Sequence, residues 1–109
     1  MGDGIVYNPP MITTITNAVL TAYCACTVCC GKNAKNICAD GKKPVQGITV
    51  AASRSIPLGS KAIINGKTYI VQDRLAKRFD DRFDIFFQSH KEARIFGKKT
   101  GATVKIVTN

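Results

Sequence analysis

Asp73 and Asp84 are the two residues of this sequence best suited to acid–base chemistry. Asp73 ends a strand-like run, KTYIVQD, and Asp84 interrupts the most hydrophobic run of the chain, RFDIFF. If these two runs form neighbouring strands, both carboxylates face one groove. A carboxyl group beside an aromatic and partly dehydrated wall has a raised pKa, so it can donate a proton near neutral pH and later take one back. The alternative is that Asp84 caps a turn or pairs with Arg82 or Arg74.

The surroundings of Asp84 follow from the two-residue repeat of a β-strand. The repeat places three apolar residues on one face, which we expect to join the core: Phe83, Ile85 and Phe87. It places three residues on the opposite face, toward the groove: Asp84, Phe86 and Gln88. The sequence therefore predicts that Phe86 forms part of the wall beside the Asp84 carboxyl group.

Cysteines form a second group with chemical potential. The chain has five of them: Cys24, Cys26, Cys29, Cys30 and Cys38. The clustered four have C-x-C-x2-C-C spacing, which is compatible with disulfides in an oxidising compartment, with a thiolate metal site, or with free thiols. No second pair lies at zinc-ribbon distance, so no metal or cofactor is predicted. The alternative is a structural zinc held by the four clustered cysteines.

His90 is the only histidine of the chain. A cysteine–histidine pair could serve as nucleophile and base. No cysteine stands out from the cluster as a nucleophile, so the favoured role of His90 is packing at the start of a helix.

Size and charge limit the class of protein. A chain of 109 residues fits one domain, and with 45% hydrophobic and 21% charged residues it is not expected to be disordered. The net charge of +9 favours polyanionic partners such as nucleic acid, acidic lipids or the anionic bacterial cell wall. No nucleic-acid-binding motif is present, so no nucleic-acid partner is expected. The sequence predicts neither a membrane span nor a secretory signal.

Short strands dominate the pattern of predicted elements. Residues 1–11 form an N-terminal arm, and residues 12–109 form one domain. Strands are predicted at residues 12–26, 48–53, 61–65, 67–73, 83–87 and 102–108. Asn65-Gly66 predicts a tight hairpin, and Ser89, Glu92 and Gly97 predict the start and stop of a helix over 89–97. Together these elements predict a mainly β fold, a small six-stranded β-barrel with one short peripheral helix.

Four segments together resemble a known family. TAYCAC followed by CCGK, then GITVAAS-x-SIPLGSK, then GKTYIVQD, then RFDIFFQSHKEA with FG are similar to the 3D domain, which is named for three aspartates. That family is related to the catalytic barrel of membrane-bound lytic transglycosylase A and to the Sps-type murein hydrolases of spore-formers. The resemblance covers residues 19–107 and implies a double-psi β-barrel.

The resemblance also implies an activity and a site. The family cleaves peptidoglycan glycan strands between N-acetylmuramic acid and N-acetylglucosamine without water and leaves a 1,6-anhydro product. Asp84 matches the acid/base of the family, and Asp73 matches the second aspartate, which shapes the site. Five further residues are expected to contact the glycan: Ser53, Lys61, Arg74, Phe86 and Gln88.

Two departures from the family pattern lie at the expected groove. Ser53 stands where the third aspartate is usual, and DRLA at residues 73–76 replaces Asp-Thr-Gly-Gly. Serine donates a hydrogen bond but supplies no negative charge, and Arg74 would lower the pKa of a neighbouring carboxylate. By the same comparison, Cys38 stands where a small polar residue is usual and is expected to be an unpaired thiol.

Two functions follow from these expectations. The first is a lytic transglycosylase, a carbon–oxygen lyase acting on peptidoglycan at the bacterial cell wall, in the periplasm or outside the cell, and encoded by a bacteriophage. The second is a non-catalytic barrel that serves as a structural or wall-binding module of a phage tail or another particle. Its partners would then be other proteins of the virion.

Overall fold

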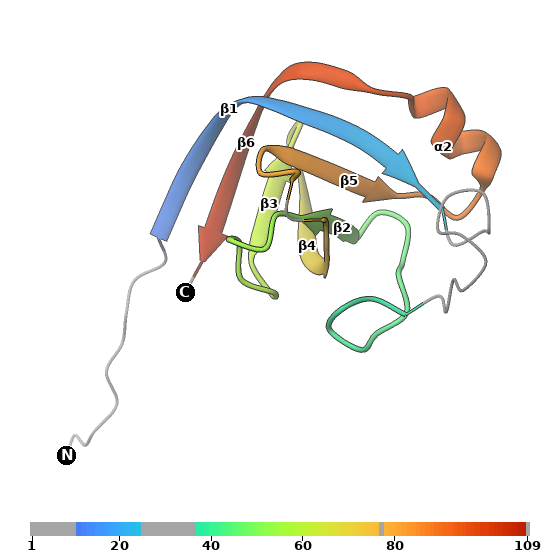
Figure 1. Ribbon diagram of the computed structural model, residues 1–109, viewed down its shortest axis with the longest axis horizontal. Coiled ribbons are helices and arrows are strands. Elements are labelled where there is room, and N and C mark those ends of the chain that lie inside the picture. The colour runs from blue at the N-terminus through green and yellow to red at the C-terminus, as the bar shows by residue number, and fades with distance from the viewer. Residues whose placement is uncertain (1–10, 25–36, 77, 109) are drawn as a thin grey trace.

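Six strands close into a barrel, and one short helix lies at its edge (Figure 1). The computed structural model describes residues 11–24, 37–76 and 78–108. The strands are β1 (Met11–Tyr23), β2 (Thr49–Ala52), β3 (Lys61–Ile64), β4 (Lys67–Arg74), β5 (Arg82–Phe86) and β6 (Lys99–Thr108), and the helix is α2 (His90–Phe96). The predicted fold class, a mainly β six-stranded barrel with one short helix, is confirmed. Within this part of the chain, no helix has the length and hydropathy needed to cross a membrane.

The barrel is mixed in strand direction. Around the barrel the order is β1-β5-β2-β4-β3-β6, and β6 closes the circle by pairing with β1. The β1–β5 and β2–β4 pairs are parallel, whereas the other four pairs are antiparallel. The short strand β2 therefore lies between β4 and β5, the two strands that carry Asp73 and Asp84 (Figure 1).

One face of each strand fills the barrel. Leu20, Val50, Val71 and Phe83, from four different strands, are at most 1% exposed and belong to one apolar core. Burying a side chain of this size stabilises the fold by about 1.5–3 kcal/mol. Ile85 also belongs to this core, and Phe87 packs against it, so the predicted core face of β5 is confirmed. The alternate residues of the same strands consequently face outward.

The Asn65-Gly66 dipeptide joins β3 to β4 as predicted. Both residues have positive φ angles, 51° and 78°, as a two-residue hairpin turn requires. Glycine has no Cβ and adopts this conformation without strain, and asparagine tolerates it better than most residues. The turn fixes Ile64 opposite Lys67 and hence the register of the hairpin.

The predicted helix is also confirmed, with the predicted caps. The Ser89 hydroxyl accepts a hydrogen bond from the Glu92 backbone N–H at 3.3 Å. Gly97 follows the helix with φ of 69° and donates its N–H to the Ala93 carbonyl. Phe96 packs against Phe87 with ring centroids 5.4 Å apart, which holds α2 on the end of the barrel.

The bounds of the strands differ from the predicted ones by one to three residues, and the differences in β6 and β1 have a structural cause. β6 begins at Lys99, three residues before the predicted start, because Lys99 and Ala102 pair with β1 although this part of the strand buries little apolar surface. β1 begins at Met11 and bends near Asn17, whose φ is 56°, at a shift in its register with β6. Such a bulge increases strand twist and helps a long strand follow a closed barrel. The rest of the predicted arm, and residues 25–26 of the first predicted strand, lie outside the described residues.

Candidate active site

Asp84 and Asp73 lie in one row that crosses four strands. Thr21 on β1 is the register partner of Asp84 on β5, Asp84 is the partner of Ala51 on β2, and Ala51 is the partner of Asp73 on β4. Register partners share a face of a sheet. Because Leu20, Phe83 and Val50 point into the core, this row faces the outside of the barrel.

A β-bulge in β4 puts Asp73 on this face. Val50 pairs with Val71, but the next residue of β2, Ala51, pairs with Asp73 and not with Gln72. Regular pairing would give Asp73 the same inward orientation as Val71. The extra residue, Gln72, is buried, and its side-chain oxygen accepts a hydrogen bond from the Thr49 hydroxyl. The bulge thus places Asp73 outward while keeping Gln72 bonded.

The prediction that Asp73 and Asp84 share a face required their strands to be neighbours, and this requirement is wrong. β2 lies between them, so their backbones are separated by two strand spacings, about 10 Å. Ala51 lies between them, and its short side chain leaves the space between the two carboxylates open. The row therefore brings both aspartates to one surface without direct contact.

The pKa of the Asp84 carboxyl group is raised. Burial raises the pKa of its carboxyl group above the ordinary value, and the negative charge of Asp73 raises it further. The Thr21 hydroxyl, which donates to Asp84 Oδ1 at 3.0 Å, and the positive charge of Arg82 act in the opposite direction. Burial dominates, so the carboxyl group keeps its proton to higher pH than an exposed aspartate does. The predicted upward shift is confirmed.

The cation that acts on Asp84 is Arg82 and not Arg74. Arg82 precedes Asp84 by two residues on β5, and its guanidinium lies 4.1 Å from the centroid of the Phe79 ring. Arg74 donates instead to the Arg54 carbonyl oxygen at 3.0 Å. Its role in the structure is to hold the turn after β2.

Aromatic side chains border the row. Tyr23 is the register partner of Phe86, two residues beyond the Thr21–Asp84 pair. Their rings meet edge to face with centroids 5.4 Å apart. Phe86 is only 5% exposed, so it dehydrates the surroundings of Asp84 more than it offers a surface for stacking. A hollow of about 290 Å³ opens next to Phe86 and is also lined by Tyr69, Phe87 and Phe96.

The loop residues 38–40, which no sequence pattern linked to the site, lie beside Asp73. The Ala39 N–H donates to Asp73 Oδ1 at 3.1 Å, and the Asp40 N–H donates to the Gln72 carbonyl oxygen at 3.1 Å. Cys38 is buried, and this burial raises the pKa of its thiol to about 11. The charges of Asp73 and Asp40 also raise this pKa, whereas a hydrogen bond from Tyr23 lowers it. Cys38 is a free thiol, as predicted. Nothing in the order of the sequence indicated that it lies near Asp73.

Ser53 is close to the row in the chain but is bonded away from it. It follows β2 directly, is 3% exposed, and lies 3.0 Å from the Ser55 hydroxyl oxygen. Its hydroxyl oxygen also accepts the Ser55 N–H at 3.2 Å. Ser53 therefore stabilises the turn over residues 53–56.

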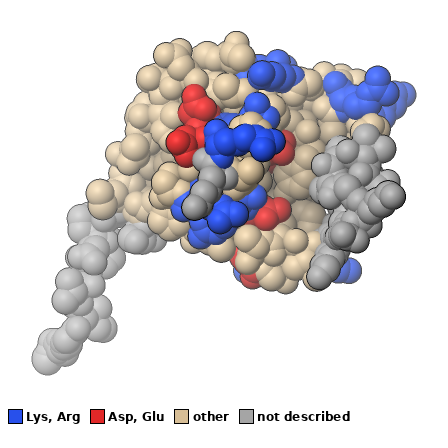
Figure 2. Space-filling model, in the orientation of Figure 1, with Lys and Arg blue, Asp and Glu red and all other residues tan. Residues whose placement is uncertain are grey.

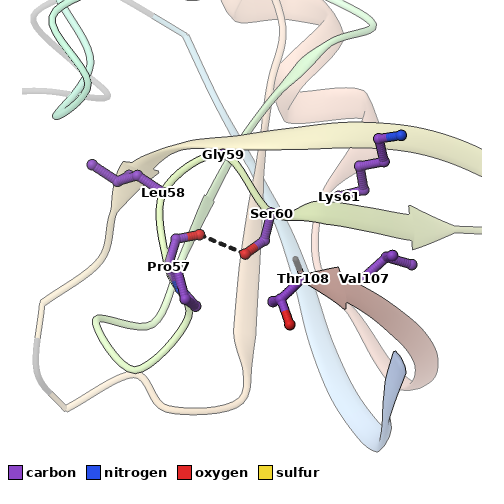
Figure 3. A pocket seen from close by; sticks show the side chains of 7 residues that line it. All are labelled: Pro57, Leu58, Gly59, Ser60, Lys61, Val107 and Thr108. Carbon is purple, nitrogen blue, oxygen red and sulfur yellow. Dashed lines mark hydrogen bonds between the residues drawn. The ribbon is translucent and has the colours of Figure 1, made fainter. Parts of the chain in front are cut away.

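Lys61 and Gln88, the other two predicted contact residues, lie apart from the row. Lys61 begins β3 and lines a hollow of about 310 Å³ with Pro57, Ser60 and Thr108 (Figure 3). The Ser60 hydroxyl donates to the Pro57 carbonyl oxygen at 2.7 Å and shapes this hollow (Figure 3). Gln88 is exposed after β5, and its backbone N–H donates to the Gln46 side chain. Neither Asp73 nor Asp84 lines the hollow at Lys61 or the hollow next to Phe86.

The positive charge of the protein is spread over its surface. Lys and Arg side chains occur at several places on the face in Figure 2, and acidic side chains lie among them. This distribution agrees with a general attraction to polyanions, with no single dense basic patch on that face.

Of the five cysteines, Cys24 and Cys38 lie among the described residues. Cys26, Cys29 and Cys30 lie outside the described residues. Cys24 is buried, and its sulfur lies 3.6 Å from Nδ1 of His90, the first residue of α2. Among residues 11–24, 37–76 and 78–108 no disulfide is formed, and no group of three His, Cys, Asp or Glu residues is arranged to hold a metal ion.

No protein-family model and no curated protein matches the chain.

Proposed function

We propose that the protein is a peptidoglycan lytic transglycosylase in which Asp84 is the acid/base. The observation that carries this proposal is the position of Asp84: a carboxyl group with a raised pKa, on the outer face of a barrel, hydrogen bonded to Thr21 and in one row with Asp73. The strand order and directions are compatible with the double-psi barrel that the resemblance to the 3D domain implies. We propose that this finer fold is also correct.

Such a site would use one carboxyl group twice. In the first step, protonated Asp84 gives its proton to the glycosidic oxygen as the bond to C1 of N-acetylmuramic acid breaks. In the second step, the Asp84 carboxylate takes the proton of the 6-hydroxyl of the same sugar, and that oxygen bonds to C1. The product is a 1,6-anhydro sugar, and Asp84 regains its proton. This scheme differs from glycosidases that need a second carboxylate, because the substrate supplies the nucleophile.

The neighbours of Asp84 suit both steps. The charge of Asp73 favours the protonated form needed first. The Thr21 hydroxyl stabilises the carboxylate formed when the proton leaves. Asp73 also supplies negative charge on the same face, which favours a positively charged, oxocarbenium-like transition state.

Ser53 favours the second candidate, a non-catalytic wall-binding or particle barrel. It replaces the third family aspartate, and its hydroxyl is bonded within its own turn. The row would then lack one negative charge that the family uses. In that case Asp84→Ala would leave the function of the particle unchanged.

The muropeptide assay with Asp84→Asn separates the two candidates. Purified peptidoglycan is incubated with the protein, and the products are analysed by mass spectrometry. Wild type is expected to release anhydro-muropeptides, and Asp84→Asn to release none. Asp81→Asn, an exposed carboxylate three residues away, is the matched control and should retain activity. No anhydro product from wild type, or undiminished product from Asp84→Asn, would reject the enzymatic proposal.

A further inference from the structure

One end of the barrel forms a hollow that the candidate active site does not use. Its volume is about 290 Å³. Its floor consists of three residues of the apolar core, one each from β3, β4 and β5: Ile64, Tyr69 and Ile85. The turn after β3, the loop before β2 and the last residue of α2 supply much of the remaining lining. The hollow is therefore built from segments that are distant in the sequence and that the closed barrel brings together.

Aromatic side chains form one side of this hollow. Phe86, Phe87 and Phe96 line it together with Tyr69. Phe87 and Phe96 are half-buried, and their rings meet at an angle of 42° with centroids 5.4 Å apart. Half-buried rings in a concave surface offer apolar contact area to a ligand. This wall suits a ligand that has an apolar face.

Polar side chains surround the aromatic wall. Three exposed residues with hydrogen-bonding side chains line the hollow: Gln46, Asn65 and Lys67. Gln46 is oriented by the Gln88 N–H, which donates to its side-chain oxygen at 2.7 Å, and Asn65 and Lys67 belong to the β3–β4 hairpin. Burial raises the pKa of the Tyr69 hydroxyl, which therefore stays protonated and can donate as well. None of the described residues that line the hollow is acidic, so the hollow does not favour a cation.

Size and chemistry together indicate a ligand with one ring in the hollow. Pockets for drug-sized ligands have volumes of about 300–1,000 Å³, and this hollow lies at the lower limit of that range. An N-acetylated sugar has the two kinds of surface that the lining offers to contact. Its ring C–H groups and its acetyl methyl group are apolar, whereas its hydroxyl and amide groups form hydrogen bonds. An aromatic side chain of a peptide would contact the rings and make no use of the polar groups around them.

We propose that this hollow binds an N-acetylated sugar of a glycan chain, as a binding site separate from Asp84. Phe86 lines the hollow and lies two residues beyond Asp84 on β5, about 7 Å along the strand. A glycan chain with one sugar in the hollow is thus held close to the Asp84 carboxyl group. The choice of a cell-wall glycan rests on the proposed function, but binding itself needs only the residues of the hollow.

NMR titration of the wild-type protein with tri-N-acetylchitotriose tests this proposal. This sugar contains no N-acetylmuramic acid, so the proposed reaction does not consume it. The amide signals of Gly47 and Asn65 are expected to shift, and maltotriose, which has three rings but no acetamido groups, should shift them much less. Phe96→Leu and Lys67→Ala should each weaken binding by about 3- to 10-fold, the effect of one aromatic contact or one hydrogen bond. Phe79→Leu, a half-buried ring outside the hollow, is the matched control and should bind like wild type.

The two variants keep the test decisive if one of them is unstable. Phe96 packs against Phe87, so its replacement can loosen α2, whereas Lys67 is exposed and its replacement should leave the fold intact. The proposal would be overturned by the absence of shifts around the hollow at millimolar sugar, by an equal response to maltotriose, or by unchanged binding in both variants. Shifts caused by N-acetylphenylalanine amide but not by chitotriose would also overturn it and would indicate a peptide-binding pocket.

The outcome is separable from that of the enzymatic proposal. Chitotriose binding in the hollow without anhydro products from peptidoglycan would reject the enzyme and keep the sugar site. Anhydro products without chitotriose binding would reject the sugar site and keep the enzyme. Asp84→Asn should bind chitotriose as wild type does, because Asp84 does not line the hollow.

Discussion

Asp73 and Asp84 face the same side of the barrel although β2 separates the strands that carry them. Ala51 is the register partner of both residues, so the two carboxylates flank the smallest side chain of the row. This arrangement gives Asp84 a negatively charged neighbour without a shared proton. The stability and the protonation of the protein should therefore depend on these residues in measurable ways.

The free energy of unfolding should change with pH because of Asp84. Its pKa in the folded protein lies above the ordinary carboxyl value, so the folded state holds a proton that the unfolded state has lost. Stability must then decrease as pH rises from the ordinary carboxyl pKa through the raised pKa. Urea unfolding of wild type and Asp84→Asn should show the variant gaining relative stability over this range, by about 1.4 kcal/mol for each unit between the two pKa values. A difference that does not change with pH would contradict the raised pKa.

Thr21→Val should destabilise the protein more at high pH than at low pH. The Thr21 hydroxyl donates to Asp84 Oδ1, and a hydrogen bond to a charged group contributes about 1.5–3 kcal/mol. The loss should be larger where Asp84 is ionised, because a hydrogen bond to the charged carboxylate is the stronger one, and the pKa of Asp84 should rise further. Unfolding measurements on both sides of the Asp84 pKa check this expectation. Thr14→Val, on an exposed part of the same strand, should show no such pH dependence.

Asp73→Asn should lower the pKa of Asp84. Asp73 raises this pKa through its charge, and asparagine keeps the shape of the side chain but removes the charge. NMR titration of the side-chain carboxyl carbons measures the shift directly. If Asp84 is the acid of the reaction, the high-pH limb of the activity profile should move to lower pH by the same amount. Asp80→Asn, an exposed control, should leave the Asp84 titration unchanged.

Cys38 should be unreactive in the folded protein. With a thiol pKa of about 11, only about 0.1% of it is thiolate at pH 8. Iodoacetamide labelling followed by peptide mass spectrometry should find Cys38 unmodified in native protein and fully modified in denaturant. Because Asp73 contributes to this pKa, Asp73→Asn should increase the labelling rate. Rapid labelling of Cys38 in the native wild type would rule out its buried, neutral state.

Local patterns in the sequence predicted much of the fold. The strand count, the Asn65-Gly66 hairpin, the caps of α2 and the core face of β5 all follow from side-chain alternation and turn chemistry, which act over a few residues. The boundaries of β6 were less predictable because its first residues pair with β1 while remaining exposed.

The candidate site was harder to predict because it depends on pairing between distant segments. The position of β2 between β4 and β5, the bulge at Gln72, and the contact of Ala39 with Asp73 are all set by the closed barrel. The aromatic residues around Asp84 in the predicted strand suggested its raised pKa correctly. It could not show that Arg82 acts on Asp84 while Arg74 bonds to a backbone carbonyl.

The bulge in β4 sets one of two possible registers between β4 and β2. If Gln72 paired regularly with Ala51, Asp73 would move opposite Ala52 and turn toward the apolar interior that holds Val50 and Phe83. An ionised carboxylate there would have no partner of opposite charge among these apolar side chains, and such burial costs far more than a lost hydrogen bond. The charge of Asp73 therefore disfavours the shifted register of β4 during folding, because that register would bury an unpaired carboxylate.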